Sequence, residues 1–311
     1  MPYTRITGTG SYLPERVLTN HDLEKFVDTS DAWIRERTGI RARHIAADGE
    51  TVADMAEAAL RQALDAAGRR PQDLDLIVVA TCTAEARFPA VAAQLQQRLG
   101  VAGFAAVDVN AACSGFIYAL SLVDALIRQG AHRCVAVIGA EKMSSLIDWS
   151  DRSTCVLFGD GAGAVIAEPA EQPGVLSTHI HADGTQGELL HHRPDTGHIV
   201  MEGNKVFRLA VKTLERIVDE TLEANGLDKS AVDWLIPHQA NLRIMLATAQ
   251  KLALPEERVI VTVDEHGNTS AASIPLAFDH GVRSGRIRRG ELLLMESFGA
   301  GFTWGSALLR Y

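Results

Sequence analysis

A cysteine stands where a strand-like run gives way to an apolar helix, in the stretch DVNAACSGFIYAL at residues 108–120. The first N–H groups of a helix have no partner inside the helix, and together with the helix dipole they stabilise negative charge. The position of Cys113 therefore predicts a thiol that loses its proton readily and acts as a nucleophile. The small neighbours Ala112 and Ser114 would let a substrate approach closely.

Two further polar residues accompany this cysteine. His238 follows the apolar run DWLIP, at a strand end of the kind where side chains of α/β sheets commonly meet ligands. Asn268 lies in the turn GNTS, just before another helix. Taken singly, each has a commoner structural explanation: a packed cysteine, a structural histidine and a turn asparagine.

The elements that must position these residues alternate between strand and helix, which predicts an α/β protein. The long segment 114–130 after Cys113 is apolar nearly all round, so a helix there should be buried at the centre of the molecule. A helix is also predicted at 51–68. Strands are predicted at 73–80, 105–110, 134–140 and 155–160.

This order of elements occurs twice. A helix at 206–226 leads into a strand at 231–238, much as the helix at 51–68 leads into the strand at 73–80. Several such matches in register predict a duplicated chain. The first half, 1–170, would carry the cysteine, and the second, 171–311, the histidine and the asparagine.

Single residues support this register. Asp75 corresponds to Asp233, and later strands ending at Gly139 and Ser297 follow these aspartates at equal separations. Cys113 then falls near Asn268, each before a helix. Two strand-to-helix turns related by pseudo-symmetry could therefore face one site.

Composition limits the class of protein. The 311 residues are 47% hydrophobic and 22% charged, as in a globular protein with a substantial core. Four widely spaced cysteines without a C-x-x-C pair indicate reduced thiols. A net charge of -9 argues against general binding of nucleic acid. With no signal sequence or membrane-length apolar run, we expect a cytoplasmic protein without a membrane anchor.

Two patterns have weaker functional interpretations. GDGAG at 159–163 imitates part of a nucleotide-binding loop, but the strand-like AVIAE follows it, so we predict a tight turn. A histidine-rich segment could hold a metal, but no ligand spacing accompanies it, so we expect no metal. Its histidines are His179, His181, His191, His192 and His198.

Motifs along essentially the whole chain resemble the β-ketoacyl-acyl-carrier-protein synthase III family, the thiolase-fold enzymes that start fatty-acid chains. The motifs are GTGSYLPERVLTN, TSDAWIRERTGIRARHIA, ACSGFIYAL, FGDGAGAV, PHQANLRI, GNTSAASIP and FGAGFTWGSALLR. The resemblance implies a duplicated five-layer αβαβα subunit that forms a homodimer.

The resemblance also implies an acyltransferase that needs no cofactor. An acyl-coenzyme A primer, expected to be acetyl-coenzyme A, would acylate Cys113. Malonyl-acyl carrier protein would then lose carbon dioxide with His238 and Asn268 donating hydrogen bonds. The resulting carbanion would attack the thioester to give a β-ketoacyl product. The backbone N–H groups of Cys113 and Ala300 would form the oxyanion hole.

Further residues match binding positions of the family. Trp33, Arg37 and Arg152 match residues that hold the adenine of coenzyme A, and a guanidinium and an indole both offer flat faces for stacking. Phe88 matches a phenylalanine donated across the dimer to the primer pocket, and Phe298 matches one beside the cysteine.

A basic helix face is the expected docking site for the acidic carrier protein. Its residues recur at spacings of three and four, and two residues of the next predicted helix could extend it. They are Lys205, Arg208, Lys212 and Arg216, with Arg243 and Lys251. An ordinary solvated helix face is the alternative, because Glu215 and Asp219 dilute the charge.

Two other classes remain to be separated. Papain-like thiol hydrolases also use Cys, His and Asn, but their CGSC[WY] context near a mature N-terminus is absent here. A non-catalytic acyl-binding protein is the other, and it predicts that no covalent adduct ever forms.

Overall fold

Two main sheets organise residues 2–311, the part of the chain described by the computed structural model. The first sheet has the order β1 (Tyr3–Tyr12), β7 (Asp160–Ala170), β6 (Val135–Lys142), β4 (Leu76–Ala80) and β5 (Ala105–Val109). The second has the order β11 (Trp234–Pro237), β12 (Leu292–Gly299), β13 (Thr303–Arg310) and β8 (Val175–Ala182). The pairs that include β4 in the first sheet and β11 in the second are parallel, and the remaining pairs are antiparallel.

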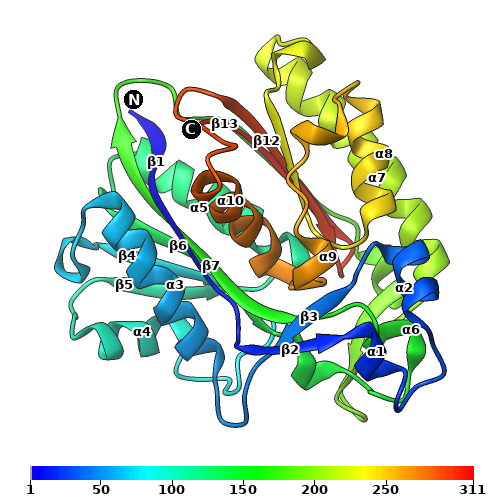
Figure 1. Cartoon of the computed structure of the whole chain (residues 1–311). Helices are drawn as coiled ribbons and strands as arrows, with labels where there is room; N and C mark the ends of the chain where they lie inside the picture. Colours follow the sequence, from blue (N-terminus) through cyan, green and yellow to red (C-terminus); the bar gives the residue numbers. More distant parts are fainter. Residues whose placement is uncertain (1) are drawn as a thin grey trace.

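Helices cover both sheets and fill the space between them. α3 (Val52–Ala67) and α4 (Val91–Leu99) lie outside the first sheet, while α7 (Gly203–Asn225) and α8 (Leu242–Lys251) lie outside the second (Figure 1). α5 (Gly115–Arg128) and α10 (Ser273–Arg283) lie between the sheets. One buried cluster draws residues from both sheets and both central helices. The predicted five-layer αβαβα thiolase fold is confirmed.

The strand orders demonstrate the predicted duplication. β1-β7-β6-β4 in the first sheet corresponds to β8-β13-β12-β11 in the second. The counterpart of β5 is reduced to an isolated bridge between Leu235 and Val259. The Asp75 carboxylate accepts from the backbone N–H of Arg133, and the Asp233 carboxylate accepts from that of Leu292. The two aspartates therefore start equivalent strands in the same way.

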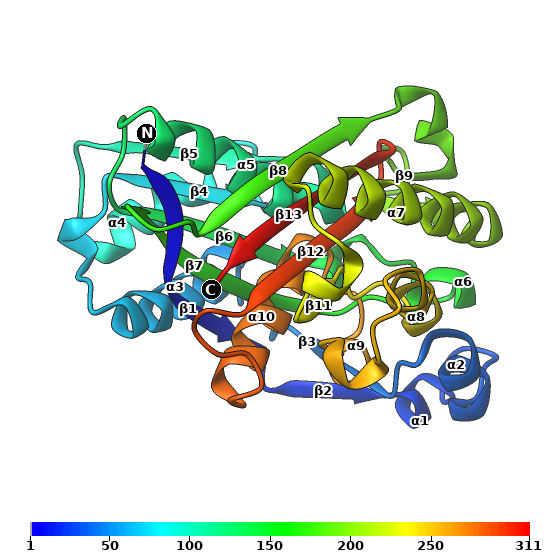
Figure 2. The same ribbon diagram turned by 90° about the horizontal axis from the view of Figure 1, so that it is seen from above.

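The smaller elements gather at one end of the second sheet. The hairpin β2 (Arg16–Thr19) and β3 (Ala42–Ile45) and the helices α1 (Asn20–Leu23) and α2 (Asp31–Thr38) lie beside α8 and α9 (Val263–His266), as Figure 2 shows. The remaining elements are α6 (Arg152–Cys155) and the hairpin β9 (Leu190–Arg193) and β10 (His198–Met201). Among residues 2–311 no helix is long and apolar enough to span a membrane.

Local sequence explains the helix boundaries. Thr51 caps α3, and Asp54 bonds back to its backbone in a capping box. Gly68 ends the helix in the left-handed region, with φ 63°. Gly226 ends α7 in the same way, with φ 61°.

Two predictions around residue 160 are wrong. Residues 155–160 do not form a strand, because Cys155 closes the short helix α6 and β7 begins only at Asp160. GDGAG is likewise no tight turn, since most of it lies within β7. Its glycines serve packing: a Cβ on Gly163 would come within 2.6 Å of the Leu276 backbone nitrogen in α10. Periodicity does not reveal a strand that is glycine-rich for this reason.

Gly139 in β6 allows the second half to approach the first. A Cβ there would stand 2.2 Å from the Ala271 carbonyl oxygen, a backbone atom that cannot rotate away. Ala271 belongs to the short 3-10 helix η7 (Ser270–Ala272), which leads directly into α10. Gly139 therefore sets the position of the turn that follows Asn268.

We expect Gly139→Ala to lower the free energy of unfolding by about 2–4 kcal/mol, because overpacking against backbone cannot relax. Urea denaturation measures this change. The matched control is Gly184→Ala, whose added Cβ would meet no atom within 4 Å. The control should stay within about 0.5 kcal/mol of the unsubstituted chain. Equal stabilities for the two variants would contradict the packing argument.

Candidate active site

Cys113 lies at the centre of the molecule, where the two halves meet. It belongs to the 3-10 helix η2 (Ala112–Ser114), between β5 and α5, and its side chain is buried. η2 packs against η7 of the other half and against the end of β12. The predicted meeting of two pseudo-symmetric turns, one before each central helix, is confirmed.

The Cys113 thiol is not easily deprotonated in this setting. Burial raises its pKa to about 12, and the negative field of Glu141 adds to the rise, while the Ser270 hydroxyl opposes it. The prediction of a lowered pKa is wrong because the sulfur is desolvated and α5 begins only at Gly115, two residues after the cysteine. The thiol therefore needs a nearby group that takes its proton during reaction.

His238 stands directly after β11, and its ring nitrogen Nδ1 has a defined partner. Its Nδ1 lies 2.6 Å from the Ser273 hydroxyl, which also accepts from the Gln239 backbone N–H at 3.3 Å. The Ser273 hydroxyl is buried. Of the two groups that it contacts here, only Nδ1 can accept the hydroxyl hydrogen. We therefore assign the Ser273 hydrogen to Nδ1 and the imidazole proton to Nε2.

The surroundings keep this imidazole neutral. Burial lowers the pKa of His238 to about 3. The ring meets Phe298 edge-on, with 5.6 Å between centroids. A neutral imidazole that carries its proton on Nε2 is a hydrogen-bond donor, and it cannot at the same time accept a proton on that nitrogen.

Asn268 is fixed through its backbone and its side-chain oxygen. Its backbone N–H donates to the Leu157 carbonyl at 2.8 Å, and its carbonyl accepts from the Gly159 N–H at 3.1 Å. Its Oδ1 accepts from the Ser270 N–H at 2.9 Å. The amide oxygen is thereby engaged, which leaves the NH2 group as the donor available to the pocket.

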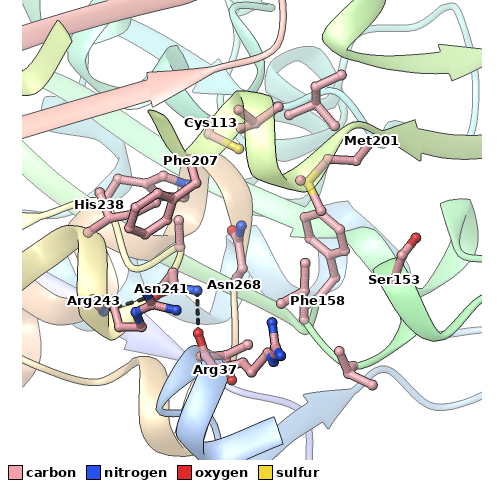
Figure 3. A pocket seen from close by; sticks show the side chains of 18 of the residues that line it. Arg37, Cys113, Ser153, Phe158, Met201, Phe207, His238, Asn241, Arg243 and Asn268 are labelled. Atoms are coloured by element: carbon pink, nitrogen blue, oxygen red, sulfur yellow. Dashed lines mark hydrogen bonds between the residues drawn. The ribbon is translucent and has the colours of Figure 1, made fainter. Parts of the chain in front are cut away.

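The three predicted residues share one pocket. Cys113, His238 and Asn268 all line it, and Figure 3 shows the three side chains directed into the same space. A potential nucleophile thus faces two neutral hydrogen-bond donors. Such donors can stabilise an enolate oxygen without adding a like charge.

This pocket runs from the surface to Cys113. Its outer part is lined by Trp33, Arg37 and Arg243, and its walls by Phe158, Met201 and Phe207. A second pocket approaches Cys113 from another side and is lined by Cys82, Thr83, Met143, Leu146, Ile199 and Ala300, among others. Two cavities therefore meet at the sulfur, so a substrate could reach it from one and place an acyl chain in the other.

The residues expected to bind coenzyme A lie together. Trp33 and Arg37 are on α2, and Arg152 is on α6. The Arg152 guanidinium stands 4.9 Å from the Trp33 ring centre, and that of Arg37 stands 5.4 Å from it. Two cations therefore gather on one indole at the mouth of the first pocket.

The two phenylalanines have different locations. Phe298 is buried on β12 and lines the pocket with Cys113. Phe88 is 83% exposed and is not among the residues that line the two pockets. At the end of β12, a Cβ on Gly299 would come within 2.8 Å of the Cys113 backbone nitrogen. The turn that carries Ala300 therefore starts directly beside the backbone of the cysteine.

The expected basic face is exposed on α7. Lys205, Arg208, Lys212 and Arg216 are all exposed, while Lys251 on α8 is partly buried. Lys205 pairs with Glu202 at 2.6 Å, and Lys251 pairs with Asp219 at 2.7 Å. Within residues 2–311 the other three α7 cations form no ion pair.

Sequence reasoning missed three residues that contact the predicted triad or neighbour it. Ser270 and Ser273 belong to the motif GNTSAAS, in which the sequence predicts only the asparagine as a site residue. Glu141 lies on β6, fully buried beside the cysteine turn. The two serines follow Asn268 by two and five residues in the same motif, a signal that could have found them, whereas Glu141 has no neighbouring motif.

Comparison with known proteins gives a consistent result. The family model for 3-oxoacyl-[acyl-carrier-protein (ACP)] synthase III matches residues 107–184, and the model for its C terminal part matches 222–311. Relatives named beta-ketoacyl-[acyl-carrier-protein] synthase III come from Thioalkalivibrio sulfidiphilus (59% identical, 100% of both chains covered) and Methylococcus capsulatus (61%, 99% of both). The crystal structure of the Aquifex aeolicus synthase III has a TM-score of 0.97 at 50% identity, covering 99% of this chain and 100% of that one.

The hydrogen bond from Ser273 should determine which nitrogen of the His238 ring carries the proton. We expect NMR of the ring nitrogens to show a neutral imidazole protonated at Nε2 from pH 8 down to pH about 5, because the folded pKa is about 3. An unfolded histidine takes up its proton near pH 6.5, so this residue favours unfolding progressively as the pH falls below that value.

Ser273→Ala removes the donor to Nδ1 and should give a mixture of tautomers in the same spectrum. Ser284→Ala, which removes an exposed hydroxyl at the end of the same helix, is the control and should leave the His238 signals in place. A proton on Nδ1 in the unsubstituted chain would contradict the assignment.

Proposed function

The chain belongs to the β-ketoacyl-acyl-carrier-protein synthase III family, and we propose that Cys113 carries its acyl intermediate. It is a condensing acyltransferase that joins an acyl-coenzyme A primer to malonyl-acyl carrier protein at the start of fatty acid synthesis. The observation that carries the proposed role is the meeting of two pockets at one cysteine flanked by neutral donors.

The first half-reaction transfers the primer. The Cys113 sulfur attacks the thioester carbonyl, coenzyme A leaves, and an acyl-enzyme thioester remains. The backbone N–H groups of Cys113 and Ala300 stabilise the oxyanion, in agreement with the close approach of Gly299 to Cys113.

The second half-reaction needs an enolate. Malonyl-acyl carrier protein loses carbon dioxide while His238 Nε2–H and the Asn268 amide donate hydrogen bonds to the thioester oxygen. Both groups are neutral, so the charge that develops is stabilised without a proton transfer. The carbanion then attacks the Cys113 thioester and releases the sulfur.

Coenzyme A enters by the first pocket. Trp33, Arg37 and Arg152 at its mouth suit a stacked adenine with nearby phosphates. The acyl group then lies in the second pocket, and Phe298 bounds the site on the side of His238. We infer a short primer, with acetyl-coenzyme A as the preferred one.

A homodimer would complete the second pocket. Among residues 2–311, β5 is an edge strand that pairs with β4 alone, and it carries the exposed Val107. Leu122 and Phe88 are also exposed apolar side chains in this half. An unpaired edge with apolar side chains is a surface for pairing with a second copy, which would place Phe88 in the partner's primer pocket.

The carrier protein docks on the basic face of α7. Arg208, Lys212 and Arg216 have their charges free, and Arg243 extends the face to the pocket mouth. We further propose the division 1–170 and 171–311 for the two halves, with Met1 outside the described residues, and a cytoplasmic location. The four-residue gap between β7 and β8 favours this boundary.

The nucleophile can be tested by intact mass. We expect brief exposure to acyl-coenzyme A thioesters, from acetyl to long chain, to give one acyl adduct that is absent in Cys113→Ser. The most rapidly bound chain length identifies the primer. Hydrolysis of the thioesters without condensation would favour a hydrolase, and binding without an adduct would favour a non-catalytic acyl-binding protein.

Charge reversal can test the docking face. Arg208→Glu with Lys212→Glu should raise KM for malonyl-acyl carrier protein about 10-fold or more at low salt and leave acylation by acyl-coenzyme A unchanged. Arg61→Glu with Arg70→Glu, at exposed positions in the first half, is the matched control. An equal rise in KM for the two double variants would show that the effect comes from the change in net charge and not from a docking face.

A further inference from the structure

The acylation of Cys113 requires a group that accepts the thiol proton, and His238 cannot act as that acceptor. Its Nε2 carries the imidazole proton, and its Nδ1 is occupied by Ser273. We propose that Glu141 accepts the Cys113 proton through the Ser270 hydroxyl. This inference depends on the proposed role of Cys113 as the acylated residue.

Glu141 is a buried carboxylate held by donors alone. It is fully inaccessible to solvent, and within residues 2–311 no cation forms an ion pair with it. Its Oε2 accepts from Thr83 Oγ1 at 2.6 Å, Thr81 Oγ1 at 3.2 Å and the Cys82 N–H at 3.0 Å. Its Oε1 accepts from Ser270 Oγ at 3.0 Å and Cys82 Sγ at 3.3 Å.

The partners of Glu141 are neutral donors, so none of them compensates its charge. Burial without a cation raises the pKa of Glu141, whereas its hydrogen bonds lower that pKa. The adjacent Lys142 does not neutralise it, because its Nζ donates to the Glu50 carbonyl. A carboxylate kept uncompensated in a dry site is a suitable proton acceptor.

Ser270 connects the carboxylate to the sulfur. Its hydroxyl donates to Glu141 Oε1, and Ser270 lines the second pocket together with Cys113, where its hydroxyl opposes the rise in the pKa of the thiol. The Ser270 hydroxyl can serve both groups because it can rotate and change the direction in which it donates. It donates to the carboxylate before proton transfer and to the thiolate afterwards. Its backbone N–H remains bonded to Asn268 Oδ1 throughout.

Electrostatics favours a coupled transfer over separate ionisation. A thiolate beside an ionised Glu141 would place two anions in one buried region, and this repulsion contributes to the raised pKa of Cys113. When the proton moves to Glu141, the carboxyl becomes neutral as the sulfur becomes charged. The site then holds one negative charge before and after the step.

The steps balance over a full cycle. The Cys113 S–H proton passes to Ser270 Oγ while the Ser270 O–H proton passes to Glu141 Oε1, and the sulfur forms its bond to the acyl carbon. Coenzyme A leaves as a thiolate and takes a proton from solvent. When the carbanion of the second half-reaction displaces the sulfur, the proton returns from Glu141 through Ser270 to Cys113.

The test separates the two half-reactions in the full chain. Glu141→Gln keeps the shape and size of the side chain but not its proton affinity, and Ser270→Ala interrupts the relay. Single-turnover acylation by acetyl-coenzyme A, followed by intact mass, should fall about 100-fold in each variant. Ser284→Ala is the control and should acylate like the unsubstituted chain.

Decarboxylation distinguishes a relay from general structural damage. The decarboxylation proposed above uses His238 and Asn268 and not the sulfur, so we compare Cys113→Ala with the same chain also carrying Glu141→Gln. The two rates should agree within about twofold. Glu141→Asp, which retains a shorter carboxylate, should recover part of the acylation rate lost in Glu141→Gln.

Two results would overturn the inference alone. One is acylation of Glu141→Gln and Ser270→Ala within about threefold of the unsubstituted rate. The other is an equal loss of acylation and decarboxylation, together with a lower melting temperature. Failure of the unsubstituted chain to form a Cys113 adduct would instead overturn the proposed function, and with it the relay.

Discussion

The contact between the turns η2 and η7 is the constraint on which the rest of the structure depends. Each turn introduces a central helix of one half, and together they bring Cys113 next to Ser270. Gly139 makes this contact possible, because any Cβ there would collide with the Ala271 carbonyl. The duplication thus does more than double the fold. It gives each half one strand-to-helix turn that faces the other across the same pocket.

Burial determines the chemistry of this site. Cys113, His238 and Asn268 are all nearly inaccessible to solvent, so charge is disfavoured on each side chain. His238 is held neutral, which suits a hydrogen-bond donor to an enolate. The same burial raises the pKa of Cys113, so a free thiolate is disfavoured in this site.

A short segment supplies most of this control. Between Asn268 and Ser273, one residue donates toward the pocket and two serines orient its partners. Ser270 fixes the amide of Asn268 and reaches Glu141, and Ser273 fixes the tautomer of His238. The segment is fully buried at the start of α10, so its backbone and hydroxyls have few alternative partners. Rotation of these groups is therefore restricted by packing.

The sequence by itself determined the alternation of strands and helices and the duplication, because periodicity is a local property of the chain. Its motifs also predicted Cys113, His238 and Asn268 as site residues. The start of the strand at 160–170 was predicted as a turn, because its glycines are required by α10, a distant segment. Only the tertiary structure decided the protonation of the site. The pKa values of Cys113 and His238 depend on burial, and the hydrogen bonds of Ser273 and Glu141 depend on neighbours far away in sequence.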